Sequence, residues 1–213
     1  FIGLAEALIA LTGKHHGEDP AVQRLGLEVV SFMRKLTDNF AEEYDLNYTL
    51  LATPAEGLSG RFVSKDRKLF GEIPGVTDKE FYTNSFHVPV NYEISSFDKV
   101  TIEGPYHELT NAGHISYIEM DGSPVNNLEA YEQLLRHMAN SNMGYVGINF
   151  PIDECTACFH RGIIDDECPS CGSQNIRRIR RITGYLSTVD RFNDAKQAEL
   201  RQRIKHNIIK FKK

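Results

Sequence analysis

The chain has 213 residues, of which 41% are apolar and 25% are charged, and its formal net charge is -5 at pH 7. This length and apolar content suffice for a core, which excludes the class of small secreted domains held together by disulfides. No apolar run approaches the roughly 18 to 20 residues of a membrane span, and mild acidity gives no general case for binding nucleic acid. The sequence therefore predicts a soluble protein.

The spacing of apolar residues predicts that helices and strands alternate along the first 150 residues. Apolar positions three and four apart predict helices over residues 1–11, 21–44 and 126–139. Short apolar runs predict strands over residues 47–53, 84–90, 114–120 and 144–150. Asn193 is expected to cap a last helix that runs to about Ile209. Such an alternation is typical of half of an α/β barrel.

Four cysteines stand in two C-x2-C pairs, Cys155 with Cys158 and Cys168 with Cys171. Four thiolates from two such knuckles can surround one ion as a tetrahedron, the usual geometry of a closed structural zinc site. Iron could occupy the same sulfurs, and two disulfides are the other alternative, although the apolar content argues against a disulfide-held fold. The sequence therefore predicts a structural Zn2+ site, and reduced, metal-bound cysteines favour the cytoplasm.

A second feature is the hexapeptide Arg181-Ile182-Thr183-Gly184-Tyr185-Leu186. It resembles the signature of glycyl radical enzymes, in which an arginine stands three residues before a glycine that is followed by tyrosine. A radical on an α-carbon is stabilised by its flanking amide groups and needs an open, near-planar centre, which a β-carbon would crowd. The alternative interpretation is an ordinary turn.

The order of these parts extends the resemblance. The knuckles are followed by a basic connector over residues 176–181, the Gly184 loop and a final helical segment. That combination resembles the carboxyl-terminal region of the anaerobic, class III ribonucleoside-triphosphate reductases, and residues 1–8, 52–62 and 82–90 also look like stretches of that family. Other glycyl radical enzymes share the Arg-x-x-Gly-Tyr loop but lack adjacent knuckles.

The resemblance implies a fold, a reaction and partners. The fold would be part of a ten-stranded α/β barrel over residues 1–150, zinc-binding knuckles over 151–176, and a glycyl-radical loop with a terminal helix over 177–213. The enzyme would reduce ribonucleoside triphosphates to deoxyribonucleoside triphosphates with formate as the reductant. A separate iron–sulfur, S-adenosylmethionine-dependent activase would generate the radical on Gly184, and the family suggests a homodimer.

One departure from the family pattern concerns the next radical in the reaction. In this family the glycyl radical takes hydrogen from a cysteine on a finger loop inside the barrel, but all four cysteines here belong to the knuckles. The sequence also begins at Phe1, within an apolar amphipathic stretch. We therefore interpret the sequence as a carboxyl-terminal part of a larger enzyme, with the reacting cysteine supplied from outside this chain.

A loop expected over residues 54–61 is the candidate for holding substrate phosphates. It follows a predicted strand, and its small residues let backbone N–H groups and a hydroxyl approach an anion. The candidate residues are Thr53, Ala55, Gly57, Ser59 and Gly60. The resemblance implies a nucleoside triphosphate there, and the alternative is a simple connector. Glu56 receives no catalytic role, because a carboxylate would be an unusual direct ligand of phosphate.

Histidines and arginines permit further interpretations. Five histidines belong to no metal-binding motif, so they are expected to be polar surface or core residues. They are His15, His16, His87, His107 and His114. The arginines of residues 177–181 could form a solvated face, a contact with the barrel mouth and the activase, or a nucleic-acid patch. The rival function is therefore a non-enzymatic zinc-ribbon protein that binds nucleic acid.

Overall fold

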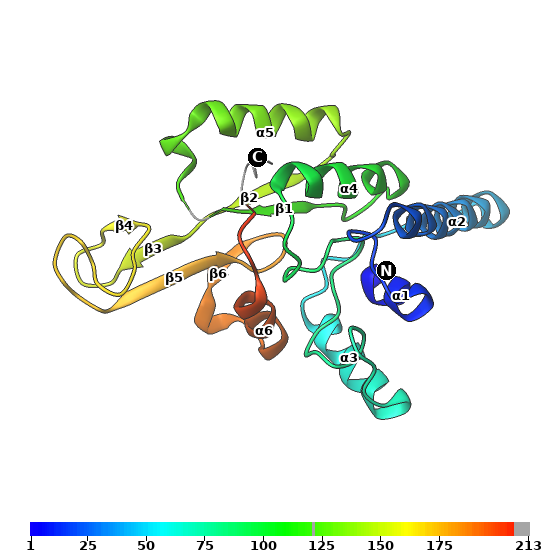
Figure 1. The fold of residues 1–213 in the computed structure, drawn as a ribbon, viewed down its shortest axis with the longest axis horizontal. Coiled ribbons are helices and arrows are strands. Elements are labelled where there is room, and N and C mark those ends of the chain that lie inside the picture. Colours follow the sequence, from blue (N-terminus) through cyan, green and yellow to red (C-terminus); the bar gives the residue numbers. More distant parts are fainter. Residues whose placement is uncertain (121, 207–213) are drawn as a thin grey trace.

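The computed structural model describes residues 1–120 and 122–206, and it mixes helices with strands (Figure 1). The helices are α1 (Leu4–Thr12), α2 (Pro20–Tyr44), α3 (Gly57–Phe70), α4 (Ser96–Leu109), α5 (Leu128–Asn140) and α6 (Asp194–Gln202), with short 3-10 helices at Pro124–Asn126 and Val189–Arg191. The strands are β1 (Ser116–Glu119), β2 (Val146–Asn149), β3 (Ile152–Cys155), β4 (Arg161–Gly162), β5 (Ile176–Arg181) and β6 (Leu186–Thr188). Within these described ranges no helix is long and apolar enough to cross a membrane.

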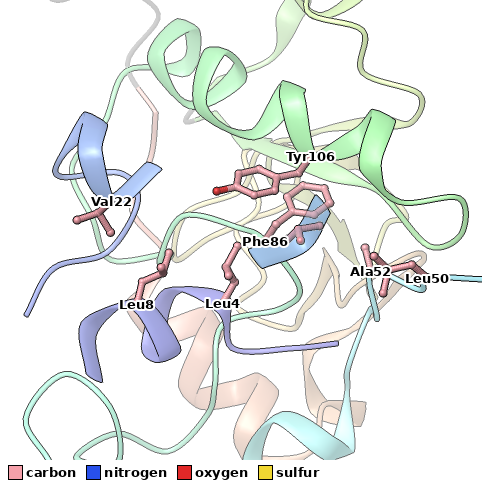
Figure 2. Close-up of a cluster of buried hydrophobic side chains, with 8 residues drawn as sticks. Leu4, Leu8, Val22, Leu50, Ala52, Phe86 and Tyr106 are labelled. Atoms are coloured by element: carbon pink, nitrogen blue, oxygen red, sulfur yellow. The ribbon is translucent and has the colours of Figure 1, made fainter. Parts of the chain in front are cut away.

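The largest core joins α1, α2 and α4 (Figure 2). Its centre is the stacked pair of Phe86 and Tyr106, whose ring centroids lie 5.3 Å apart with an interplanar angle of 9°. Gly26 of α2 faces Tyr106, and a β-carbon there would lie 2.4 Å from the Tyr106 hydroxyl oxygen. The glycine therefore allows α2 to approach α4 closely.

The second core lies under a β-α-β unit formed by β1, α5 and β2. The two strands are parallel, with Ser116 opposite Val146 and Glu119 opposite Asn149. Helices α4 and α5 both contribute to the apolar cluster on this pair. Its buried members are Val100, Ile118, Leu134 and Met138. Parallel strands joined through a helix are the unit from which α/β sheets are built.

The remaining strands form a separate antiparallel sheet in the order β4-β3-β5-β6. In Figure 1 its β3–β4–β5 end extends away from α1, α2 and α3. Strand β5 pairs Ile176 with Cys155 at one end and Arg181 with Leu186 at the other. Its six residues span about 20 Å, so β5 connects the cysteine knuckles directly to the Gly184 loop.

Several predicted elements are confirmed. Helices over 1–11, 21–44 and 126–139 match α1, α2 and α5, and the strands over 114–120 and 144–150 match β1 and β2. Asn193 caps α6 as expected, because its side chain accepts a hydrogen bond from the Lys196 N–H. The helix ends earlier than predicted, at Gln202, and residues 207–209 of the prediction lie outside the described residues.

Other predicted elements are wrong. Residues 47–53 form no strand and make one isolated bridge, between Leu51 and Ala112. Residues 47–49 are exposed, and no strand in the described part of the chain pairs with them. Residues 84–89 are buried but turn, since Ser85 has a φ of 41° and the His87 N–H donates to the Asn84 carbonyl at 3.0 Å. Apolar alternation there reflects burial in a loop. Helices α3 and α4 were not predicted, and α4 contains Pro105.

Lys99→Met is expected to destabilise the fold by about 3 to 5 kcal/mol at pH 7, because it leaves a buried carboxylate without its cation. Lys99 pairs with Glu103 one helical turn away, and the Glu103 side chain is fully buried. Burial raises the pKa of Glu103, but the charge of Lys99 outweighs that effect and brings the pKa to about 2.

The resulting stabilisation is present above the ordinary pKa of 4.5 and is lost as the pH falls toward 2. Urea unfolding of the wild-type and Lys99→Met chains at pH 7 and pH 3 measures the effect. The difference between the two chains should shrink at pH 3. Equal free energies of unfolding at pH 7 would contradict the prediction.

Candidate metal centre and the Gly184 loop

The four cysteines converge at one end of the antiparallel sheet. Their sulfur atoms all lie within 4.8 Å of one another, and the Sγ–Sγ distances are 3.6 Å for Cys155–Cys171 and 3.5 Å for Cys158–Cys168. All four are free thiols, so the disulfide alternative is wrong. Four sulfurs at about 2.3 Å from one ion have edges of about 3.8 Å. The cluster therefore fits a tetrahedral thiolate-bound ion such as Zn2+.

The two knuckles have the same backbone geometry. The N–H groups of Phe159 and Gly172, each four residues after the first cysteine of its pair, donate to the carbonyls of Cys155 and Cys168 at 2.9 Å. Both residues have a left-handed backbone, with φ of 60° for Phe159 and 72° for Gly172. This repeated turn aims each pair of sulfurs at a common point. Glycine adopts this conformation without strain at Gly172, whereas Phe159 holds it with a side chain.

The arginines of β5 are held by two buried carboxylates of β3. Asp153 accepts hydrogen bonds from Arg180 at 2.6 Å and from Arg178 at 3.1 Å, while Glu154 accepts one from Arg177 at 2.9 Å. The Asp153 side chain is 1% exposed and that of Glu154 is 7% exposed. The arginine face is therefore partly solvated, with Arg177 52% and Arg178 35% exposed, while its side chains neutralise the two buried carboxylates.

Gly184 lies at the tip of the hairpin formed by β5 and β6. The Ile182 N–H donates to the Tyr185 carbonyl at 3.0 Å and closes the turn. Thr183 is buried, whereas Gly184 and Tyr185 are exposed. A β-carbon built on Gly184 would meet no atom within 4 Å, and the residue does not have the positive φ that requires glycine. Neither steric crowding nor the backbone conformation therefore requires glycine at this position. The Gly184 α-carbon is open to approach.

Residues from β1 and β5 fix one side of the Gly184 loop. The Tyr117 hydroxyl donates to the Thr183 carbonyl, and burial raises the pKa of Tyr117 so that the hydroxyl keeps its proton. Arg181 lies over the Tyr117 ring at 5.8 Å from its centroid. The Arg181 guanidinium also donates to Asn149 Oδ1 at 2.8 Å and to the Gly184 carbonyl at 3.4 Å.

Glu56 fixes the other side of the loop. Its Oε1 accepts a hydrogen bond from Thr183 Oγ1 at 2.8 Å, and its Oε2 accepts one from the Tyr185 hydroxyl at 3.2 Å. The carboxylate thus contacts the side chains on both sides of Gly184. Sequence reasoning gave Glu56 no role, and nothing local to residues 54–61 indicates a contact with a segment 127 residues away.

Comparison with known proteins assigns the family. The family model described as anaerobic ribonucleoside-triphosphate reductase matches residues 1–206. The chain belongs to this family. It is 38% identical over 217 residues to the anaerobic ribonucleoside-triphosphate reductase of Escherichia coli (strain K12), a match that covers 97% of this chain and 30% of that protein. It is 34% identical over 192 residues to the enzyme of Enterobacteria phage T4, covering 85% of this chain and 31% of that protein.

Solved anaerobic ribonucleotide reductases share the fold. One superposes with a TM-score of 0.81 at 23% identity, covering 97% of this chain and 33% of its own. The Thermotoga maritima enzyme with glycerol in the active site gives 0.75 at 23% identity, covering 93% and 31%. The chain spans about 30% of the length of the curated relatives it matches.

The candidate phosphate residues lie around the start of α3. The expected loop over residues 54–61 is therefore shorter than predicted, because the helix begins at Gly57. The Thr53 N–H donates to the Phe1 carbonyl at 3.2 Å, and Ala55 is buried. The buried Ser59 hydroxyl donates to the Glu56 carbonyl at 3.2 Å. A β-carbon on Gly60 would lie 2.6 Å from the Ala195 β-carbon, so Gly60 allows α3 to pack against α6. Gly57 begins the helix with open space around its α-carbon. Phosphate binding here stays a prediction.

Four of the five histidines are buried, as a core role predicts: His15, His16, His87 and His107. Burial lowers the pKa of His16 and of His107 to about 4, so both are neutral at pH 7. His87 contacts the Ile115 carbonyl at 2.6 Å and His107 contacts Ser116 Oγ at 2.9 Å. Among the described residues the cysteine cluster is the one group with the spacing to hold a metal.

Proposed function

We propose that this chain is the glycyl-radical portion of an oxygen-sensitive ribonucleotide reductase that stores its radical on Gly184. The observation that carries the proposal is the environment of Gly184. Its α-carbon is open, while Glu56 and Tyr117 hold the residues beside it through side chains from other parts of the fold. A fixed frame around one unobstructed glycine is what a stored backbone radical requires. Membership of the reductase family supports the same assignment.

The proposed chemistry begins on a partner protein. A radical-SAM activase with an iron–sulfur cluster takes one hydrogen atom from the Gly184 α-carbon. The glycyl radical then takes a hydrogen atom from a cysteine thiol that another part of the enzyme supplies, since the four cysteines here form the metal cluster. Formate gives up two electrons and becomes carbon dioxide, and the ribonucleoside triphosphate loses its 2′-hydroxyl as water to become a deoxyribonucleoside triphosphate.

The parts of the chain divide this work in the proposal. Residues 1–150 contribute to the ten-stranded barrel, with the start of α3 near the substrate phosphates, and the enzyme acts as a homodimer. Residues 151–176 bind Zn2+ through Cys155, Cys158, Cys168 and Cys171. Residues 177–213 carry the radical loop and the helix after it. The zinc has a structural task, because four thiolates leave no open coordination position for a substrate.

The rival function, a zinc-ribbon protein that binds nucleic acid, is not favoured. Its basic patch would need free arginines, but Arg177, Arg178 and Arg180 are paired with Asp153 and Glu154. Family membership over residues 1–206 points to the reductase instead.

Anaerobic activation followed by low-temperature EPR tests the proposal. The complete enzyme is treated with the activase, S-adenosylmethionine and a reductant, and a doublet from coupling to one α-hydrogen is the expected signal. The activated enzyme should then release labelled carbon dioxide from labelled formate in a one-to-one ratio with deoxyribonucleotide. No radical in a folded, zinc-loaded enzyme would overturn the assignment to Gly184, and turnover without carbon dioxide would overturn formate as the reductant.

A further inference from the structure

Arg203, the residue that follows α6, reaches the backbone immediately before Gly184. Its guanidinium donates to the Arg181 carbonyl at 2.9 Å and to the Ile182 carbonyl at 3.2 Å. These are consecutive carbonyls at the point where β5 ends and the Gly184 loop begins. The planar fork of an arginine can satisfy two such acceptors at once, whereas a lysine ammonium is a single point of charge.

The same guanidinium is anchored on its other edge by Glu199. Glu199 Oε1 accepts from Arg203 Nη2 at 2.7 Å, and its Oε2 is paired with Lys196. The Arg203 side chain is 10% exposed, and the side chains of Glu199 and Lys196 are 5% and 0% exposed. Burial opposes ionisation of Arg203, but Glu199 and Glu119 outweigh it and raise its pKa. Arg203 is therefore a charged donor in a site that excludes most water.

The backbone on both sides of Arg203 is fixed as well. Before it, α6 is capped by Asn193 and packs closely against α3 where Gly60 meets Ala195. After it, the His206 N–H donates to the Glu119 carbonyl at 2.7 Å, and the Glu119 N–H donates to His206 Nδ1 at 2.9 Å. The backbone that carries Arg203 is thus held by α6 on one side and by the end of β1 on the other. A residue held in this way can set the position of the backbone that it contacts.

We infer that Arg203 is a positioning residue that keeps the Gly184 loop docked against the fold. This inference rests on the proposed function, because docking matters when the radical must sit at one place during the reaction. The Gly184 α-carbon is already open, but an activase has to take the loop into its own active site, so a loop held less firmly is activated more readily. The same loop spends less time in the position from which the radical reacts. Arg203 therefore affects activation and turnover in opposite directions.

Arg203→Lys separates this role from a merely structural one. The lysine keeps the positive charge that Glu199 and Glu119 face, so a structural charge role predicts wild-type behaviour. It loses the fork that binds both carbonyls, so the positioning role predicts a looser loop. The matched control is Arg201→Lys in the last turn of α6, where Arg201 is 64% exposed and contacts the equally exposed Glu80 at 3.4 Å.

Two readouts are needed on the complete enzyme. Hydrogen exchange before activation should be about tenfold faster over residues 182–186 in Arg203→Lys than in Arg201→Lys, the effect of losing one charge-assisted hydrogen bond. After limiting activase treatment, Arg203→Lys should accumulate the EPR doublet faster and form about tenfold less deoxyribonucleotide per spin.

The outcomes distinguish a positioning role of Arg203 from general damage to the enzyme and from failure of the proposed function. Unchanged exchange and unchanged turnover per spin in Arg203→Lys would overturn the inference while leaving the wild-type doublet, and so the proposed function, in place. A parallel fall in radical yield and turnover would show general damage and would also overturn the positioning role. Absence of the doublet in the wild-type enzyme would overturn the proposed function itself, and the exchange readout would still report whether Arg203 holds the loop.

Discussion

Gly184→Ala is expected to retain the fold and the bound zinc and to lose the glycyl radical completely. The added β-carbon would meet no atom within 4 Å, and the backbone at this position is not left-handed. Its cost in stability should therefore stay within about 0.5 kcal/mol, as for other exposed substitutions. The same β-carbon would crowd the planar radical and block the approach to the α-hydrogen. EPR after anaerobic activation measures the effect as loss of the doublet, with no deoxyribonucleotide formed.

Gly162→Ala is the matched control for this experiment. Gly162 lies in β4 of the same sheet, and a β-carbon there would meet His160 at an ordinary 3.7 Å. This variant should show the wild-type doublet. Air should then cleave the activated control at Gly184 and release a fragment that carries α6, whereas Gly184→Ala should stay intact. A doublet or cleavage in Gly184→Ala would place the radical elsewhere.

Local chemistry explains what the sequence could predict. The cysteine cluster depends on two short turns, each of which is complete within six residues, so its spacing alone indicates convergence. Helices α1, α2 and α5 have apolar stripes, and Asn193 has a side chain suited to capping. The Gly184 motif is likewise contained in six consecutive residues, and its radical role stays a prediction. In each case the signal and the structure lie in the same stretch of chain.

Long-range contacts explain what the sequence could not predict. Glu56 and Arg203 reach the Gly184 loop from segments 127 residues before and 21 residues after their partners, and neither has a local pattern that marks it. Helix α4 includes a Gly-Pro pair that indicates a break, yet packing of Val100 and Tyr106 stabilises the helix. Residues 84–90 alternate apolar and polar side chains as a strand does. The structure shows that this pattern belongs to a loop whose residues 84–89 are buried by the surrounding elements.

Removal of the zinc is expected to unfold the cysteine module and leave the helical part of the chain intact. The module has almost no core of its own, since its buried cluster consists of Cys155, Ile164 and Cys168, with Ile176 partly buried. Burying one isoleucine contributes about 1.5 to 3 kcal/mol, whereas zinc contributes roughly 10 to 16 kcal/mol in small zinc modules at pH 7. Loss of the metal therefore removes most of the stabilisation, and hydrogen exchange over residues 152–181 should accelerate by orders of magnitude.

The extent of this loosening tests whether the metal supports the Gly184 loop. Strand β5 carries the effect of the metal toward Gly184, but Arg203 and Tyr117 hold the loop from α6 and β1, which lie outside the module. Exchange should therefore rise sharply up to Arg181 and less from Ile182 onward, while α1, α2 and α4 keep their protection. The zinc-loaded chain in the same buffer is the control. Unchanged exchange over residues 152–181 after the metal is removed would mean that the sheet is stable without it, and that the arginine pairs with Asp153 and Glu154 hold β3 against β5.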